Sequence, residues 1–210
     1  MTVQQCWIWL ITTCFSPRFH TTFLAARARS NFASANLYRR VMTVMWLSTG
    51  VTMATALHVW IPVLVLLVFP LTVLYQISAL IQFTSEHYWG APFIEGETSP
   101  ERHARLSQAR YCLTAMPQRN GNGLARFAAR LVLWALIVVL IDIPARIAIL
   151  VGELVVHDRH HRFPAEKSWA LALYLPEDEQ TVHRSRENWG LIGALNAVFR
   201  HVYALGPQAA

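Results

Sequence analysis

Three histidines, His157, His160 and His161, lie within five positions of the stretch GELVVHDRHHRFP, residues 152–164. If this stretch is helical, positions i, i+3 and i+4 fall on one face, so that the three imidazole rings point the same way. Imidazole nitrogens are ligands for iron, copper and zinc. Glu153 lies one helical turn before His157, where its carboxylate can accept the second ring N–H and orient the imidazole. The spacing therefore predicts a metal site on one face of a helix.

A fourth histidine, His87, lies in FTSEHYWG, residues 83–90. Glu86 and His87 are the first ionisable residues after a long uncharged stretch, so His87 would emerge at a membrane surface. One alternative is an interfacial histidine in an ordinary aromatic belt, beside Tyr88 and Trp89. Together with the HxxHH spacing, the metal-ligand interpretation of His87 is favoured. The other five histidines have no partner at ligand spacing and are assigned no metal role: His20, His58, His103, His183 and His201.

The donor set also restricts the metal. The three cysteines, Cys6, Cys14 and Cys112, form no CxxC pair and are expected to be free thiols. A structural zinc site is a compact set of four ligands that often includes cysteine. Four histidines spread over more than 70 residues, at the mouth of a membrane segment, better suit an oxygen-activating iron site.

The charge pattern predicts a membrane protein. Of the 210 residues, 54% are hydrophobic and 14% charged, and Val41–Ser85 contains no Asp, Glu, Lys or Arg. As a helix, these 45 residues would extend roughly 68 Å, enough to cross an apolar layer of about 30 Å twice. A break at HVWIP predicts a transmembrane helical hairpin, roughly residues 41–58 and 60–83. A buried hairpin of a soluble protein is the alternative.

Arginine sets the expected orientation. Residues 1–40 contain five arginines and no acidic residue, which places this flank on the cytoplasmic side by the positive-inside rule. The hairpin returns the chain to that side, so the histidine motifs are predicted to be cytoplasmic. The arginines can serve as a topology signal, or bind a lipid headgroup, a CoA or carrier phosphate, or an acidic electron donor. Because no nucleic-acid motif accompanies them, no nucleic-acid partner is expected.

The remaining segments complete an all-α membrane architecture with a histidine-rich cap. Residues 16–40 are expected to form a basic interfacial connector, residues 84–164 the cytosolic or interfacial part, and residues 165–210 a C-terminal tail. The apolar stretch 124–156 is the hardest to place, because Asp142 and Arg146 would be costly in lipid. We expect two shorter helices there, broken at DIPAR and lying in the interface or under the cap.

The box ending in HHRFP, the preceding membrane hairpin and the SEHYWG histidine together resemble the membrane-bound fatty acid desaturase superfamily, over roughly residues 16–180. The resemblance implies a single, partial desaturase-like domain over residues 1–210. It also implies a non-haem di-iron centre for which this chain supplies His157, His160, His161 and His87. Glu86, Asp142 and Glu153 are candidates for orienting these ligands. The first two histidine boxes of the family are absent from these 210 residues.

The activity implied by the resemblance is O2-dependent oxidation of a lipid acyl chain, once the missing boxes are supplied. The partners implied are an electron donor of the ferredoxin or cytochrome b5 type, a membrane lipid or acyl substrate, and a complementing N-terminal chain. Two alternatives remain open: a related alkane or lipid hydroxylase, and a non-catalytic, degenerate membrane protein.

Overall fold

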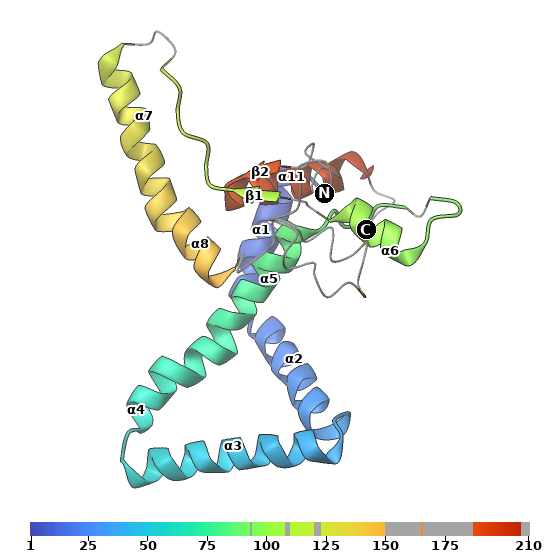
Figure 1. The fold of residues 1–210 in the computed structure, drawn as a ribbon, viewed down its shortest axis with the longest axis vertical. Helices are drawn as coiled ribbons and strands as arrows, with labels where there is room; N and C mark the ends of the chain where they lie inside the picture. The colour runs from blue at the N-terminus through green and yellow to red at the C-terminus, as the bar shows by residue number, and fades with distance from the viewer. Residues whose placement is uncertain (93, 108–109, 120–122, 150–164, 166–186, 207–210) are drawn as a thin grey trace. The chain divides into compact units, whose positions relative to one another are not determined.

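The computed structural model describes residues 1–92, 94–107, 110–119, 123–149, 165 and 187–206. The described chain is largely helical, and its regular β structure consists of one pair of short strands (Figure 1). Two compact units are present. One comprises Ile8–Leu80, and the other comprises Met1–Trp7 together with Ile81–Ala210.

The unit Ile8–Leu80 begins in α1 (Val3–Cys14) and continues through α2 (Pro17–Ala28), the π-helical turn η1 (Arg29–Ala33) and α3 (Leu37–Ala56). Two of these helices have side-chain caps at their N-termini. Ser16 Oγ accepts from the Phe19 N–H before α2, and Asn36 Oδ1 accepts from the Arg39 N–H before α3. Each cap satisfies one of the backbone donors that the first turn of a helix leaves unpaired.

Helix α2 is fastened by polar contacts within this unit. The two ring nitrogens of His20 lie 2.6 Å from Gln76 Oε1 and 2.8 Å from the carbonyl oxygen of Cys14. The guanidinium of Arg27 lies 4.4 Å from the centre of the Tyr75 ring, a cation–π arrangement. His20 therefore has a packing role that its isolated position in the sequence did not indicate. Polar and apolar residues are mixed around α2, so this part of the predicted interfacial connector has no distinct apolar face.

The predicted break at HVWIP is confirmed, because α3 ends at Ala56 and α4 (Trp60–Val63) begins four residues later. His58 takes a positive φ of 53°, the left-handed conformation that commonly ends a helix. The N–H of Val59 donates to the Ala54 carbonyl at 3.0 Å, which closes the last turn of α3.

From Trp60 to Glu86 the chain is one helical body: α4, the π turns η2 (Leu64–Val68) and η3 (Pro70–Leu74), and α5 (Tyr75–Glu86). Proline inside an α-helix removes one hydrogen bond and clashes with the carbonyl four residues earlier. The wider π turns on both sides of Pro70 accommodate its ring, so the helix continues. These 27 residues are long and apolar enough to cross a membrane, in agreement with the second half of the predicted hairpin.

The second unit contains α6 (Ser99–Leu106), β1 (Arg110–Cys112), β2 (Glu187–Trp189) and α11 (Leu191–Ala204). The strands pair in parallel, with Tyr111 opposite Asn188. One face of α11 is buried, including Leu195, Val198 and Phe199. Trp7 packs edge-on against Phe199, with 5.2 Å between ring centres, and its indole N–H donates to Asn196. The core of this unit thus joins the first residues of the chain to a helix near its end.

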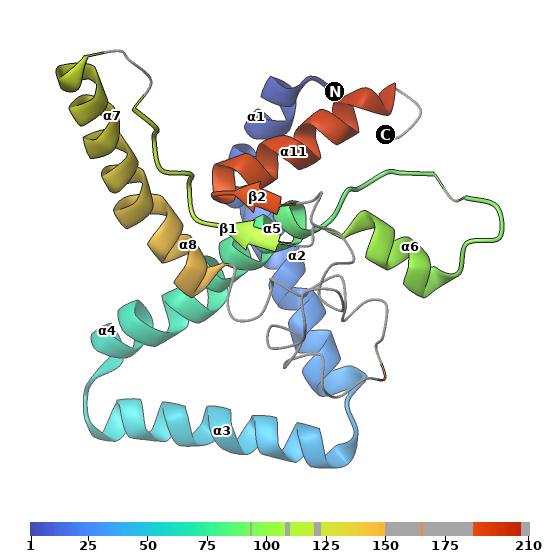
Figure 2. The same cartoon turned by 45° about the horizontal axis from the view of Figure 1, so that its top comes forward.

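A second long helix runs from Leu124 to Ala148 as α7 (Leu124–Ile137), the π turn η4 (Val138–Asp142) and α8 (Ile143–Ala148) (Figures 1 and 2). The predicted break at DIPAR is wrong. The N–H of Ile143 donates to the Val138 carbonyl, so the helix is already widened immediately before Pro144 and does not need to break.

By length and composition, the two candidate membrane spans among the described residues are Trp60–Glu86 and Leu124–Ala148. The first half of the predicted hairpin, residues 41–58, forms most of α3 but is not one of them. Arg39 and Arg40 in its first turn, and the hydroxyl residues along it, lower its mean hydropathy. A membrane location is supported, and the second half of the predicted hairpin is one of the candidate spans. That residues 41–58 also cross stays a prediction.

Candidate functional site

His87 is placed by the end of the apolar helix Trp60–Glu86. It follows α5 directly and forms an isolated antiparallel bridge with Ser107, the residue after α6. The N–H of Tyr88 donates to the Leu106 carbonyl at 2.7 Å, which extends this pairing. Two backbone segments therefore hold the His87 backbone at the point where the chain leaves the helix.

A polar side chain lies beside the His87 ring. The hydroxyl of Ser107 donates to the His103 carbonyl at 2.7 Å. Ser107 Oγ also lies 3.2 Å from His87 Nδ1. A polar partner at one ring nitrogen is the means by which proteins orient a metal-ligating histidine.

A cavity of about 310 Å³ lies beside His87. Its lining is mainly aromatic and apolar, with Phe83, Trp89 and Leu106 contributing, and His103 and Arg102 add polar groups. The Trp89 ring stands edge-on to the His87 ring, with 5.4 Å between centres. Trp89 Nε1 donates to the Phe83 carbonyl at 3.1 Å, which ties the indole to the end of α5. The cavity can therefore accommodate an apolar group of a ligand next to the His87 imidazole.

Glu86 and Asp142, the two described candidates for orienting the histidines, are both buried. Glu86 accepts a hydrogen bond from the Gln82 side chain at 2.7 Å, one turn earlier in α5. Asp142 accepts one from the backbone N–H of Thr114 at 2.7 Å. The structure therefore gives Asp142 a role in holding the chain beyond β1. Neither contact involves a histidine.

The HxxHH histidines His157, His160 and His161, and Glu153 with them, lie outside the described residues. Within the part of the chain that the structure describes, no three His, Cys, Asp or Glu side chains gather closely enough to hold a metal ion. The structure thus describes the residues around His87, and the predicted set of four histidine ligands stays a prediction.

Two further histidines contact this region, one in the His87 cavity and one against the next residue, Tyr88, and the sequence indicated neither. His103 lines the same cavity from α6, with its Nδ1 2.8 Å from the Ser99 carbonyl. His201 of α11 packs its ring against Tyr88, with 5.0 Å between ring centres. His103 is exposed, as expected, but no spacing in the sequence indicates that α6 returns to His87.

Comparison of the chain with protein-family models, with curated proteins and with solved structures finds no match.

Proposed function

We propose that this chain forms part of a membrane-bound, desaturase-like non-haem di-iron oxidoreductase that acts on lipid acyl chains. The observation behind the proposal is the position of His87 at the end of an apolar helix, beside a mainly apolar cavity. The Ser107 hydroxyl lies 3.2 Å from His87 Nδ1, where it can orient the ring. The HxxHH motif supplies the other three histidines of the proposed ligand set.

These residues fit iron by donor type, because neutral imidazole is a good ligand for non-haem iron. When bound, the iron pair supplies the O2 chemistry that oxidises an unactivated methylene group. The residues of this chain would hold the iron ligands in position and orient the acyl substrate. The Ser107 hydroxyl is placed to orient the His87 ring, and Phe83 and Trp89 line a mainly apolar space in which part of an acyl chain can lie.

Contacts across helix Leu124–Ala148 support a common side for His87 and the HxxHH motif. Strand β1, before this helix, pairs with β2, after it, and the Tyr88 ring lies against His201. Between residues 149 and 187 the longest run without Asp, Glu, Lys, Arg or His is SWALALYLP, nine residues long. Such a run is too short to recross a bilayer, which takes about 20 residues. The helix therefore lies along the membrane surface and does not cross once.

The chain that leads into this helix supports the same placement. After β1, Leu113–Arg119 has no regular secondary structure, yet Thr114 contacts Asp142 and accepts a hydrogen bond from Trp134 Nε1 at 2.8 Å. Backbone without regular hydrogen bonds is not tolerated facing lipid hydrocarbon. We place the helix in the interface, with its exposed side chains such as Leu133, Leu140 and Ile147 toward the bilayer.

The proposal requires ligands that these 210 residues lack, because four histidines are too few for two irons. The remaining boxes would come from a complementing chain or segment, and electrons from a ferredoxin or cytochrome b5 type donor. By the positive-inside rule, the arginine-rich flank favours a cytoplasmic side for the histidine motifs. Hydroxylation in place of desaturation uses the same ligands and differs only in how the substrate is positioned.

The test is an iron count. The chain would be purified in detergent after expression with iron, alone and together with a neighbouring upstream reading frame, and iron per protein measured by elemental analysis. We expect two irons per complex only with the complementing partner. The iron should be lost in His87→Ala, His157→Ala and His161→Ala, and retained in His58→Ala, a histidine at the turn before α4.

Iron binding that survives all three substitutions would overturn the proposed ligand set. No iron under either condition would overturn the di-iron proposal and favour a non-catalytic membrane protein.

If the iron count is as expected, lipid analysis of cells that contain the complex separates an alkene product from an alcohol.

A further inference from the structure

All the charged side chains in residues 1–85 are arginines, and four of them flank one turn of the unit Ile8–Leu80. This arginine corner consists of Arg27 and Arg29, before and at the start of η1, and Arg39 and Arg40 in the first turn of α3. All four side chains are exposed. No acidic residue in this part of the sequence offsets their charge, so the corner has a strong positive potential.

The hydrogen bonds of the corner leave that charge uncompensated. Arg40 donates to the carbonyl oxygens of Ala33 and Ala35, each at 2.8 Å. Arg39 Nε donates to the side-chain oxygen of Asn31 at 3.2 Å. These acceptors are neutral, so they orient the guanidinium groups without cancelling their charge. Arg39 and Arg40 are thereby held beside η1.

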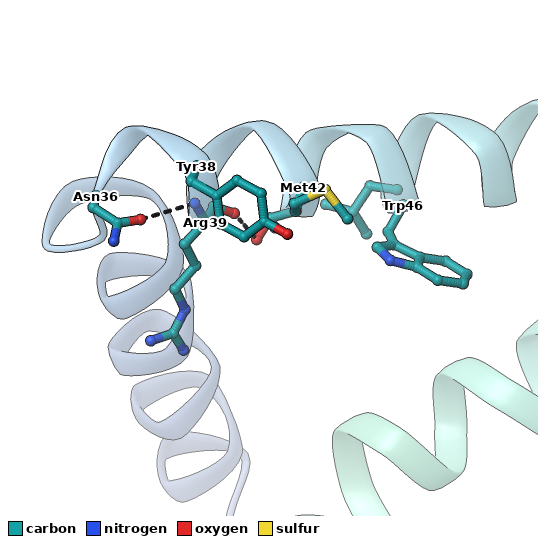
Figure 3. A pocket seen from close by; sticks show the side chains of 7 residues that line it. Asn36, Tyr38, Arg39, Met42 and Trp46 are labelled. Carbon is teal, nitrogen blue, oxygen red and sulfur yellow. Dashed lines mark hydrogen bonds between the residues drawn. The ribbon is translucent and has the colours of Figure 1, made fainter.

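Apolar side chains continue from the corner along α3. Tyr38, Met42 and Trp46 are spaced four residues apart and, with Arg39, line a shallow groove (Figure 3). Tyr38 and Trp46 are each 74% exposed. The groove changes from charged to apolar within about 10 Å along the helix axis, at roughly 1.5 Å per residue. This is the polarity gradient found between lipid headgroups and acyl chains, where Tyr and Trp are enriched.

We infer that the arginine corner and this groove bind anionic phospholipid, with the phosphate at the guanidinium groups and the glycerol and upper acyl region along Met42 and Trp46. A small anion would use only the arginines and leave the exposed aromatic rings in water. An anionic lipid satisfies both parts of the surface, and juxtamembrane arginines attract anionic lipids in this way. The inference does not rest on the proposed oxidoreductase function.

The test is a competition between two lipids. The purified chain in a neutral detergent is mixed with equal amounts of dioleoylphosphatidylglycerol and dioleoylphosphatidylcholine, and the retained lipids are counted by native mass spectrometry. We expect phosphatidylglycerol to be enriched. In Arg29→Gln/Arg39→Gln the enrichment should fall about fivefold per arginine removed, while Arg29→Lys/Arg39→Lys should retain most of it.

The matched control is Arg126→Gln/Arg130→Gln, which removes two exposed arginines of α7 that have no groove residue beside them and should lower the enrichment clearly less. Trp46→Ala should reduce retention of both lipids, and excess inorganic phosphate should not displace phosphatidylglycerol. Equal retention of the two lipids by the unsubstituted chain would overturn the inference. So would an equal loss in the α7 control, or full displacement by phosphate.

Discussion

The carboxylate of Asp142 accepts a hydrogen bond from the backbone N–H of Thr114 at 2.7 Å, which ties an acidic residue of an apolar helix to the chain beyond β1. A buried carboxylate is costly unless it is hydrogen-bonded, and this contact gives Asp142 a partner inside the protein. It also explains how the largely apolar helix Leu124–Ala148 can bury an acidic residue.

The same contact predicts a difference between two substitutions. Asp142→Ala would leave the Thr114 N–H without its acceptor and should destabilise the protein by about 1–3 kcal/mol. Asp142→Asn keeps a carbonyl oxygen at that position and should lower the free energy of unfolding clearly less than Asp142→Ala. Thermal unfolding in detergent measures both. Equal losses in the two variants would mean that the hydrogen bond is not what Asp142 contributes.

The placement of helix Leu124–Ala148 predicts which residues are accessible from which side. Single cysteines at Ser34, Arg119 and Ala148, in a chain whose three native cysteines are replaced by serine, should all react with an impermeant maleimide from one side of sealed vesicles. A cysteine at His58 should react only from the other side. If Arg119→Cys and Ala148→Cys label from opposite sides, the helix crosses the membrane and the common side proposed for the histidines is lost.

Gly190, the residue before α11, is a sensitive position beside Asp142. Its φ is +75°, and a Cβ there would lie 2.5 Å from Thr114 Oγ1 and 3.2 Å from Asp142 Oδ1. Gly190→Ala therefore combines backbone strain of about 1–2 kcal/mol with a steric clash. Gly96→Ala is the matched control, because Gly96 has a φ of +79° and no atom within 4 Å of the added Cβ. The Gly190 variant should unfold at the lower temperature; equal shifts would exclude the clash.

Local patterns in the sequence predicted the helix break at His58, the apolar helix that begins at Trp60, and the position of His87 directly after it. Each of these depends on residues close together in the chain: a charge-free run, a turn and its flanks. The sequence did not predict the parallel pairing of Arg110–Cys112 with Glu187–Trp189, because strands of three residues carry almost no periodicity. The approach of His103 to His87 was missed for a related reason, since it depends on where a loop returns.

The continuity of helix Leu124–Ala148 through Pro144 was the other difference between the prediction and the structure. The sequence places Pro70 and Pro144 inside apolar stretches, and a proline normally indicates a kink or an end. Both helices continue because a π turn precedes each proline. The π turn before Pro144 has a second effect. In an α-helix, Trp134 and Asp142 would point roughly 80° apart at 100° per residue, and the extra residue of the π turn brings both toward Thr114.

Ser107 offers a test of how His87 is positioned. Ser107→Ala removes the oxygen that lies 3.2 Å from His87 Nδ1, and loss of a polar partner of a metal-ligating histidine typically lowers metal affinity about 10- to 100-fold. In the iron-loaded complex, Ser107→Ala should release iron to a chelator earlier than the unsubstituted chain, whereas Ser107→Thr, which keeps the hydroxyl, should not. Ser99→Ala, on the exposed side of α6, is the control. An unchanged release in Ser107→Ala would remove the orienting role of the serine.

The ion pair between Glu97 and Arg105 predicts a pH dependence for the loop before α6. Arg105 Nε lies 2.6 Å from Glu97 Oε1, and this hydrogen bond lowers the pKa of Glu97 below its ordinary value of 4.5. A carboxylate whose pKa is lowered by folding contributes stability above its unfolded pKa and loses it as the pH falls through the folded pKa. Hydrogen exchange of the amides in residues 94–106 should therefore show protection near neutral pH that declines only below about pH 4.5. In Glu97→Gln the exchange, corrected for its intrinsic pH dependence, should be faster near neutral pH and lack that decline. A decline of the same size in the Gln variant would show that another group is responsible.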